Sequence, residues 1–132
     1  MPHLRRALRA LAALVVLCVF AAPGQAQELR PSLQLPTIAA SAAAAADWAT
    51  TYHALKNYRV RETNPLLHPW QESPGKLVTA GALMDVMAYS AWNMTMGKRH
   101  PKIAAAGMWA MAGFRTYLAI HNMRNTQRAA RR

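Results

Sequence analysis

Three apolar stretches, each about 20 residues long, follow one another along the chain. They cover roughly residues 37–56, 77–96 and 103–122. Their apolar residues surround the expected helix on all sides, and the alternation typical of a strand does not occur. At about 1.5 Å per residue, each stretch is long enough to cross the hydrocarbon core of a bilayer. The pattern therefore predicts an all-α protein, a three-helix bundle that spans a membrane.

Prolines and glycines separate the three stretches. Residues 57–75 hold three prolines, which forbid a continuous helix, so we expect a loop in which Pro65 begins a short helical turn. Gly97 is expected to cap the second helix, and Pro101 is expected to begin the third. Residues 27–36 are polar and hold two prolines, so they are expected to form an extended linker.

Residues 1–26 have the pattern of a secretory signal peptide. Three arginines precede an uninterrupted apolar run over residues 10–22, and Gly24 and Ala26 are the small residues that a signal peptidase requires. The run is shorter than the roughly 20 residues that span a bilayer comfortably. We therefore expect export and cleavage after Ala26, which would also remove the single cysteine, Cys18. An uncleaved N-terminal anchor is the alternative.

One charged residue lies near the middle of each apolar stretch: Asp47, Asp85 and Arg115. A charge at this depth costs about 2.5–3.5 kcal/mol on the membrane-insertion scale, enough to make any one helix marginal. The lengths of the stretches and their many small residues, which allow close helix packing, favour a membrane bundle. The central charges favour the alternative, a small soluble helical bundle in the periplasm.

Basic residues dominate the charge, with 16 Lys and Arg against 5 Asp and Glu and a formal net charge of +11. With an exported N-terminus, the cytoplasmic segments would hold eight basic residues and the external segments four, which follows the positive-inside rule. We therefore expect residues 37–123 to form a multi-pass domain in the bacterial inner membrane. Residues 124–132 would form a basic tail on its cytoplasmic side.

Four arginines in this tail predict an anionic partner. They are Arg124, Arg128, Arg131 and Arg132. Beside a membrane, such a basic stripe attracts anionic lipid, which is the expected partner. Nucleic-acid binding is the competing interpretation of the high charge, but export and the lack of interleaved aromatic residues argue against it.

The three central charges are expected to meet. Counted from the cytoplasmic ends of their helices, Asp47, Asp85 and Arg115 lie 8 to 10 residues deep, so their heights agree within about 3 Å. One arginine level with two carboxylates would offset much of the desolvation cost through paired hydrogen bonds. We expect a buried cluster that fixes the register of the helices. A proton or ion relay is the alternative interpretation.

Further polar motifs accompany these charges in a fixed order. They are D-x-x-T-T with Asp47, Thr50 and Thr51, E-x-N-P-L with Glu62, Asn64 and Pro65, then Lys76, and finally the pair His121 and Asn122. This series, over residues 46–122, resembles a family of small bacterial membrane proteins to which no reaction is assigned. The resemblance implies a helical integral membrane protein.

Two of these motifs have a simple structural interpretation. Thr50 and Thr51 share the helix face of Asp47, so their hydroxyls are expected to bond back to the helix or to a facing polar group. His121 and Asn122 are expected to act as a helix cap or to form a hydrogen bond between helices.

The preferred role is therefore structural or interactive, with the protein partner left open. The alternative is a membrane enzyme or transporter accessory that uses Asp47, Glu62 and His121. The histidines and acidic residues lack the close spacing of a metal-binding motif, and the serines lack the context of a catalytic triad. We expect no metal, cofactor or catalytic residue.

Overall fold

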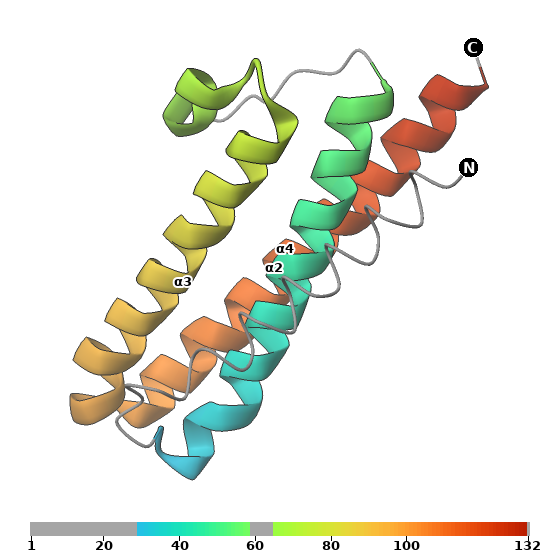
Figure 1. Cartoon of the computed structure of the whole chain (residues 1–132). Coiled ribbons are helices and arrows are strands. Elements are labelled where there is room, and N and C mark those ends of the chain that lie inside the picture. The colour runs from blue at the N-terminus through green and yellow to red at the C-terminus, as the bar shows by residue number, and fades with distance from the viewer. Residues whose placement is uncertain (1–28, 59–64, 132) are drawn as a thin grey trace.

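The computed structural model describes residues 29–58 and 65–131, and within them the chain is helical and without strands. Three long helices form a bundle (Figure 1). The elements are α2 (Pro31–Asn57), the short 3₁₀ helix η2 (Pro65–Trp70), α3 (Pro74–Arg99) and α4 (Pro101–Ala130). The all-α prediction is confirmed for the described residues. The predicted signal peptide over residues 1–26 lies outside them.

Proline marks the start of every long helix. Pro31, Pro74 and Pro101 occupy the first turns of α2, α3 and α4. Proline is favoured there because its missing N–H needs no partner in the first turn and its fixed φ already suits a helix. Pro65 likewise begins η2. The predicted helix start at Pro101 and the helical turn at Pro65 are both confirmed.

The helix α2 begins about six residues earlier than expected, so the predicted extended linker is wrong over residues 31–36. Pro36 lies inside α2, where a proline removes one intrahelical hydrogen bond at a cost of about 3 kcal/mol. Both Pro36 and Leu33 are buried, and Leu33 is only 2% exposed. Burial of this first segment of α2 against α3 offsets the local cost.

Gly97 does not cap its helix, so this prediction is also wrong. The helix α3 continues through Arg99 and is capped by His100, whose N–H donates to the carbonyl of Met96 at 2.7 Å. Gly97 is buried, and a Cβ at this position would overlap the side chain of Leu33. Its role is therefore to let α2 pack closely on α3.

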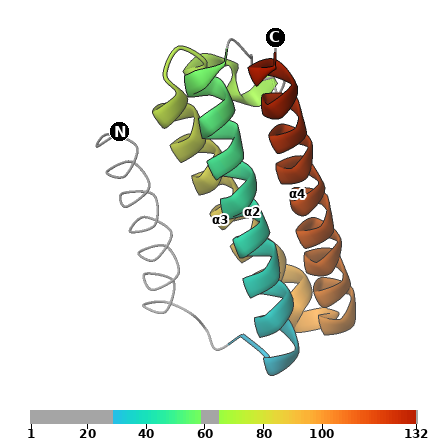
Figure 2. The ribbon, with the colours of Figure 1, turned by 90° about the vertical axis from the view of Figure 1, so that its right-hand side faces the viewer.

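The core combines a few large side chains with alanines on α2 and α4. The buried cluster contains Ala40, Ala44, Trp48, Leu67, Leu77, Val78, Tyr89, Met108 and Ala112. The helix α2 packs most extensively against α4, and Figure 2 shows these two helices side by side. Alanines on both helices allow this close approach. At the α3–α4 turn, Trp92 Nε1 donates to the carbonyl of Ala104 at 3.1 Å and joins the two helices.

Large apolar side chains cover the outside of the bundle. On α3 the exposed ones are Leu83, Met84, Val86, Met87, Met94 and Met96. On α4 they are Ile103, Trp109, Met111, Phe114, Tyr117, Ile120 and Met123. Within the described residues, α4 is the one helix that is long and apolar enough to cross a membrane by length and composition. These two criteria alone therefore support one candidate span and not the three that the sequence predicts.

Candidate functional site

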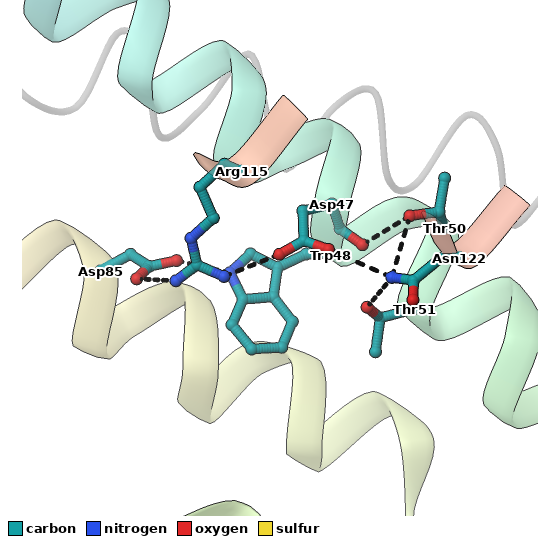
Figure 3. A network of polar contacts seen from close by, with 7 residues as sticks. All are labelled: Asp47, Trp48, Thr50, Thr51, Asp85, Arg115 and Asn122. Atoms are coloured by element: carbon teal, nitrogen blue, oxygen red, sulfur yellow. Dashed lines mark hydrogen bonds and ion pairs between the residues drawn. The ribbon is translucent and has the colours of Figure 1, made fainter. Parts of the chain in front are cut away.

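Arg115 joins all three long helices in the interior of the bundle (Figure 3). Its Nη1 donates to Asp47 Oδ2 on α2 at 2.7 Å, and its Nη2 donates to Asp85 Oδ1 on α3. The Asp47 side chain is 5% exposed, and those of Asp85 and Arg115 are 14% exposed. The contacts expected among these three residues are thus present, and we call them the charge cluster.

The remaining carboxylate oxygens of the charge cluster also accept hydrogen bonds. Trp48 Nε1 donates to Asp85 Oδ2 at 2.7 Å, and Asn122 Nδ2 donates to Asp47 Oδ1 at 3.1 Å. All four carboxylate oxygens therefore have a donor, two of them from a cation. Hydrogen bonds from a cation to a carboxylate are shorter and stronger than neutral ones, and Arg115 supplies two of the four.

The Trp48 ring packs against the Arg115 guanidinium of the charge cluster. The Arg115 guanidinium carbon lies 5.2 Å from the centroid of this ring, a cation–π geometry. The far edge of the ring sits directly on Gly81 of α3, where a Cβ would overlap it. Sequence reasoning missed Trp48. The signal that could have revealed it is Gly81, four residues before Asp85 and so on the same face of α3, where it leaves room for a large ring.

Asn122 and the two threonines extend the network along α2 and α4. Thr50 Oγ1 donates to the backbone carbonyl of Asp47 at 2.8 Å, the bond back to the helix that the sequence predicts. Asn122 Nδ2 also donates to Thr51 Oγ1 at 2.9 Å. Two roles are expected for Asn122, a helix cap and an inter-helix hydrogen bond. The inter-helix hydrogen bond is present. The cap is not, because α4 continues to Ala130.

The other motif residues lie away from the charge cluster. Lys76 is exposed in the first turn of α3, and His121 is exposed on α4, where its ring stacks on Tyr117 at 6.0 Å between centroids. Glu62 and Asn64 lie outside the described residues. In the described part of the chain, no group of three His, Cys, Asp or Glu side chains is placed to hold a metal ion.

The arginines at the C-terminal end of α4 form an exposed stripe. Arg124, Arg128 and Arg131 are all exposed, and their spacing places them on one side of the helix end. Residues 124–130 of the predicted tail are therefore helical. Arg132 lies outside the described residues.

A second polar group lies in the interior toward the α3–α4 turn. Asn93 Nδ2 donates to Thr37 Oγ1 at 3.0 Å and so links α3 to α2. Tyr89 lies between Asn93 and Asp85 on α3 and is 7% exposed. The four-residue spacing of Tyr89 from Asp85 places both on one helix face, as expected from the sequence. Sequence reasoning missed Asn93, although its eight-residue spacing from Asp85 places it on the same face.

No protein-family model, curated protein or solved structure matches the chain. The resemblance to a family of small membrane proteins therefore depends on the sequence motifs alone.

Proposed function

We propose that the chain is a multi-pass protein of the bacterial inner membrane with a structural or interaction role. One observation carries the proposal. Each long helix has one charged residue in its apolar middle, and these three residues meet inside the bundle. The outside of α3 and α4 is meanwhile covered by large apolar side chains. Lipid would cover these side chains, whereas monomeric soluble proteins rarely expose large apolar patches.

The spacing of charges along α3 and α4 supports a membrane span for each of these two helices. Lys76 and Lys98 on α3 are 22 positions apart, and so are Lys102 and Arg124 on α4. This separation corresponds to about 33 Å along a helix, close to the roughly 30 Å of the hydrocarbon core. Between these basic residues, the only Asp, Glu, Lys or Arg is Asp85 on α3 and Arg115 on α4.

The charge cluster explains how helices of moderate hydropathy could insert together. An isolated charge at the bilayer centre costs about 2.5–3.5 kcal/mol on the insertion scale, and charges inside membranes therefore pair with one another and face the protein interior. Arg115 between Asp47 and Asp85 has this arrangement. We infer that α2 and α3 are stable in the membrane only as partners of α4.

A structural role fits the charge cluster better than a proton relay. All four carboxylate oxygens and both Nη groups of Arg115 are engaged in the contacts described above. A slip of one helix by a single turn, about 5.4 Å, would break these contacts. The cluster therefore fixes the register of the three helices.

The modest hydropathy of α2 and α3 favours a second candidate, a soluble helical bundle in the periplasm. Carbonate extraction of membranes from cells that carry the full chain with a C-terminal tag separates the two candidates. We expect the protein to stay in the membrane pellet. Its release into the supernatant, together with release from intact cells by osmotic shock, would contradict the membrane proposal and support the periplasmic bundle.

A further inference from the structure

An open groove lies between Trp70 of η2 and the first turns of α3. Figure 1 shows η2 and the start of α3 at the end of the bundle opposite the α3–α4 turn. Its volume is about 470 Å³. The lining residues are Trp70, Gly75, Lys76, Thr79, Ala80 and Leu83. The groove therefore combines a cation, an aromatic ring and aliphatic side chains in one place.

The polar chemistry of the groove comes from Lys76. Its side chain is exposed, whereas the hydroxyl of Thr79 already donates to the backbone carbonyl of Gly75 at 2.8 Å. Glu72, the acidic residue in the turn before α3, does not line the groove. The groove is thus suited to a group of negative charge.

The apolar side of the groove continues along the outside of α3. Lys76, Ala80, Leu83 and Met87 follow one another at helical spacing on one face. Leu83 is 59% exposed and Met87 is 63% exposed. A ligand with its anionic group at Lys76 would therefore lay an apolar tail over Leu83 and Met87.

We propose that this groove binds one phospholipid with an anionic headgroup. The phosphate would pair with Lys76, the ring of Trp70 would lie at headgroup level, where tryptophan is enriched in membrane proteins, and an acyl chain would follow Leu83 and Met87. Under the proposed topology, this end of α3 is cytoplasmic. The inference rests on the proposed membrane location, since an acyl chain on α3 needs a bilayer around it.

The test compares two lipids on the full chain purified in a mild detergent. Phosphatidylglycerol and phosphatidylcholine with the same acyl chains are titrated in parallel, and bound lipid is counted by native mass spectrometry. We expect the wild-type protein to prefer phosphatidylglycerol about fivefold, as one basic residue near a membrane surface allows. In a background in which Arg124, Arg128, Arg131 and Arg132 are changed to Gln, so that the basic tail no longer attracts anionic lipid, Lys76→Gln should abolish most of this preference. Lys98→Gln, the matched change at the opposite end of α3, should leave it intact.

Equal binding of the two lipids by the wild-type protein would overturn the proposal. So would a loss of lipid preference in Lys98→Gln as large as that in Lys76→Gln. Soluble glycerol phosphate is added as a competitor. Displacement of lipid by glycerol phosphate at equal concentration would mean that the groove takes a free anion, which also overturns the proposal. Carbonate extraction of the same cells separates the two claims. If the protein stays in the membrane pellet but shows no lipid preference, only the lipid site is rejected, and the proposed membrane location stands.

Discussion

Arg115 on α4 and Asp47 on α2 are 68 positions apart in the chain, yet Nη1 of the guanidinium donates a hydrogen bond to Oδ2 of the carboxylate at 2.7 Å. The same guanidinium also donates to Asp85 on α3, 30 positions away. One side chain therefore connects all three long helices. Changes at this point should affect the whole bundle, whereas changes at the exposed helix ends should not.

Arg115→Met should strongly destabilise the protein. The substitution leaves Asp47 and Asp85 buried without their cation, and removal of one partner from a buried ion pair costs about 3–5 kcal/mol. The yield of monodisperse protein and the thermal unfolding midpoint, followed by circular dichroism in detergent, measure the effect. Arg124→Met removes an exposed arginine from the same helix and is the matched control. Unchanged yield and midpoint in Arg115→Met would contradict the structural role of the charge cluster.

Replacing all three charged residues together should be less harmful than replacing the arginine alone. In Asp47→Asn, Asp85→Asn, Arg115→Met, the interior no longer holds an unpaired charge, so much of the lost stability should return. The midpoint of the triple variant is compared with that of Arg115→Met under identical conditions. A midpoint at or below that of Arg115→Met would show that the loss does not come from the unpaired carboxylates.

Trp48→Phe tests the contribution of the indole. The shorter phenyl ring loses the bond from the indole N–H to Asp85 and withdraws from Gly81, where the far edge of the indole now lies. A buried acceptor left without its donor costs about 1–3 kcal/mol. Trp109→Phe, at an exposed tryptophan on α4, should change the midpoint far less. Equal shifts in the two variants would mean that neither the indole N–H nor its packing on Gly81 contributes stability.

Two glycines give a matched pair with opposite expected effects. Gly81→Ala places a Cβ where the Trp48 ring now lies, so we expect a loss of about 1–3 kcal/mol from overpacking. At Gly113 a Cβ would meet nothing within 4 Å, and alanine there should raise stability by about 0.5–1 kcal/mol because it is the better helix former. Chemical unfolding in detergent measures both. The reverse order of stability would contradict the packing of α2 on α3.

Asn122→Leu should weaken the contact between the end of α4 and α2. The substitution removes the donor to Asp47 and Thr51, and the loss of a hydrogen bond to a buried carboxylate should cost about 1–3 kcal/mol. Asn125→Leu, three residues further along and exposed, is the control. Hydrogen exchange of the α4 amides should quicken near residue 122 in the first variant only. Identical exchange in both would exclude a role for Asn122 in joining the helices.

Several features could be predicted because they depend only on positions along a helix. The charged residue in the middle of each apolar stretch and the rise per residue were enough to place Asp47, Asp85 and Arg115 at one height. Prolines at 65 and 101 were enough to locate two element starts, because proline has a strong local preference for them.

Other features depend on contacts between helices and could not be derived from spacing. The inclusion of residues 31–36 in α2 results from the burial of Leu33 and Pro36, which outweighs the local signal of the prolines. Trp48 follows Asp47 directly, and a neighbouring position points to a different side of the helix. Its bond to Asp85 follows from the packing of α2 on α3. A sequence does not specify that packing residue by residue.

The three-span arrangement can be tested directly by cysteine labelling in intact cells. With Cys18→Ser as background, Ser73→Cys precedes α3 and His100→Cys lies in the α3–α4 turn, so the two introduced thiols report on opposite ends of α3. A membrane-impermeant maleimide should label His100→Cys from the periplasm, whereas Ser73→Cys should react only after the inner membrane is permeabilised. Equal labelling of both positions in intact cells would show that α3 does not cross the membrane and would contradict the proposed function.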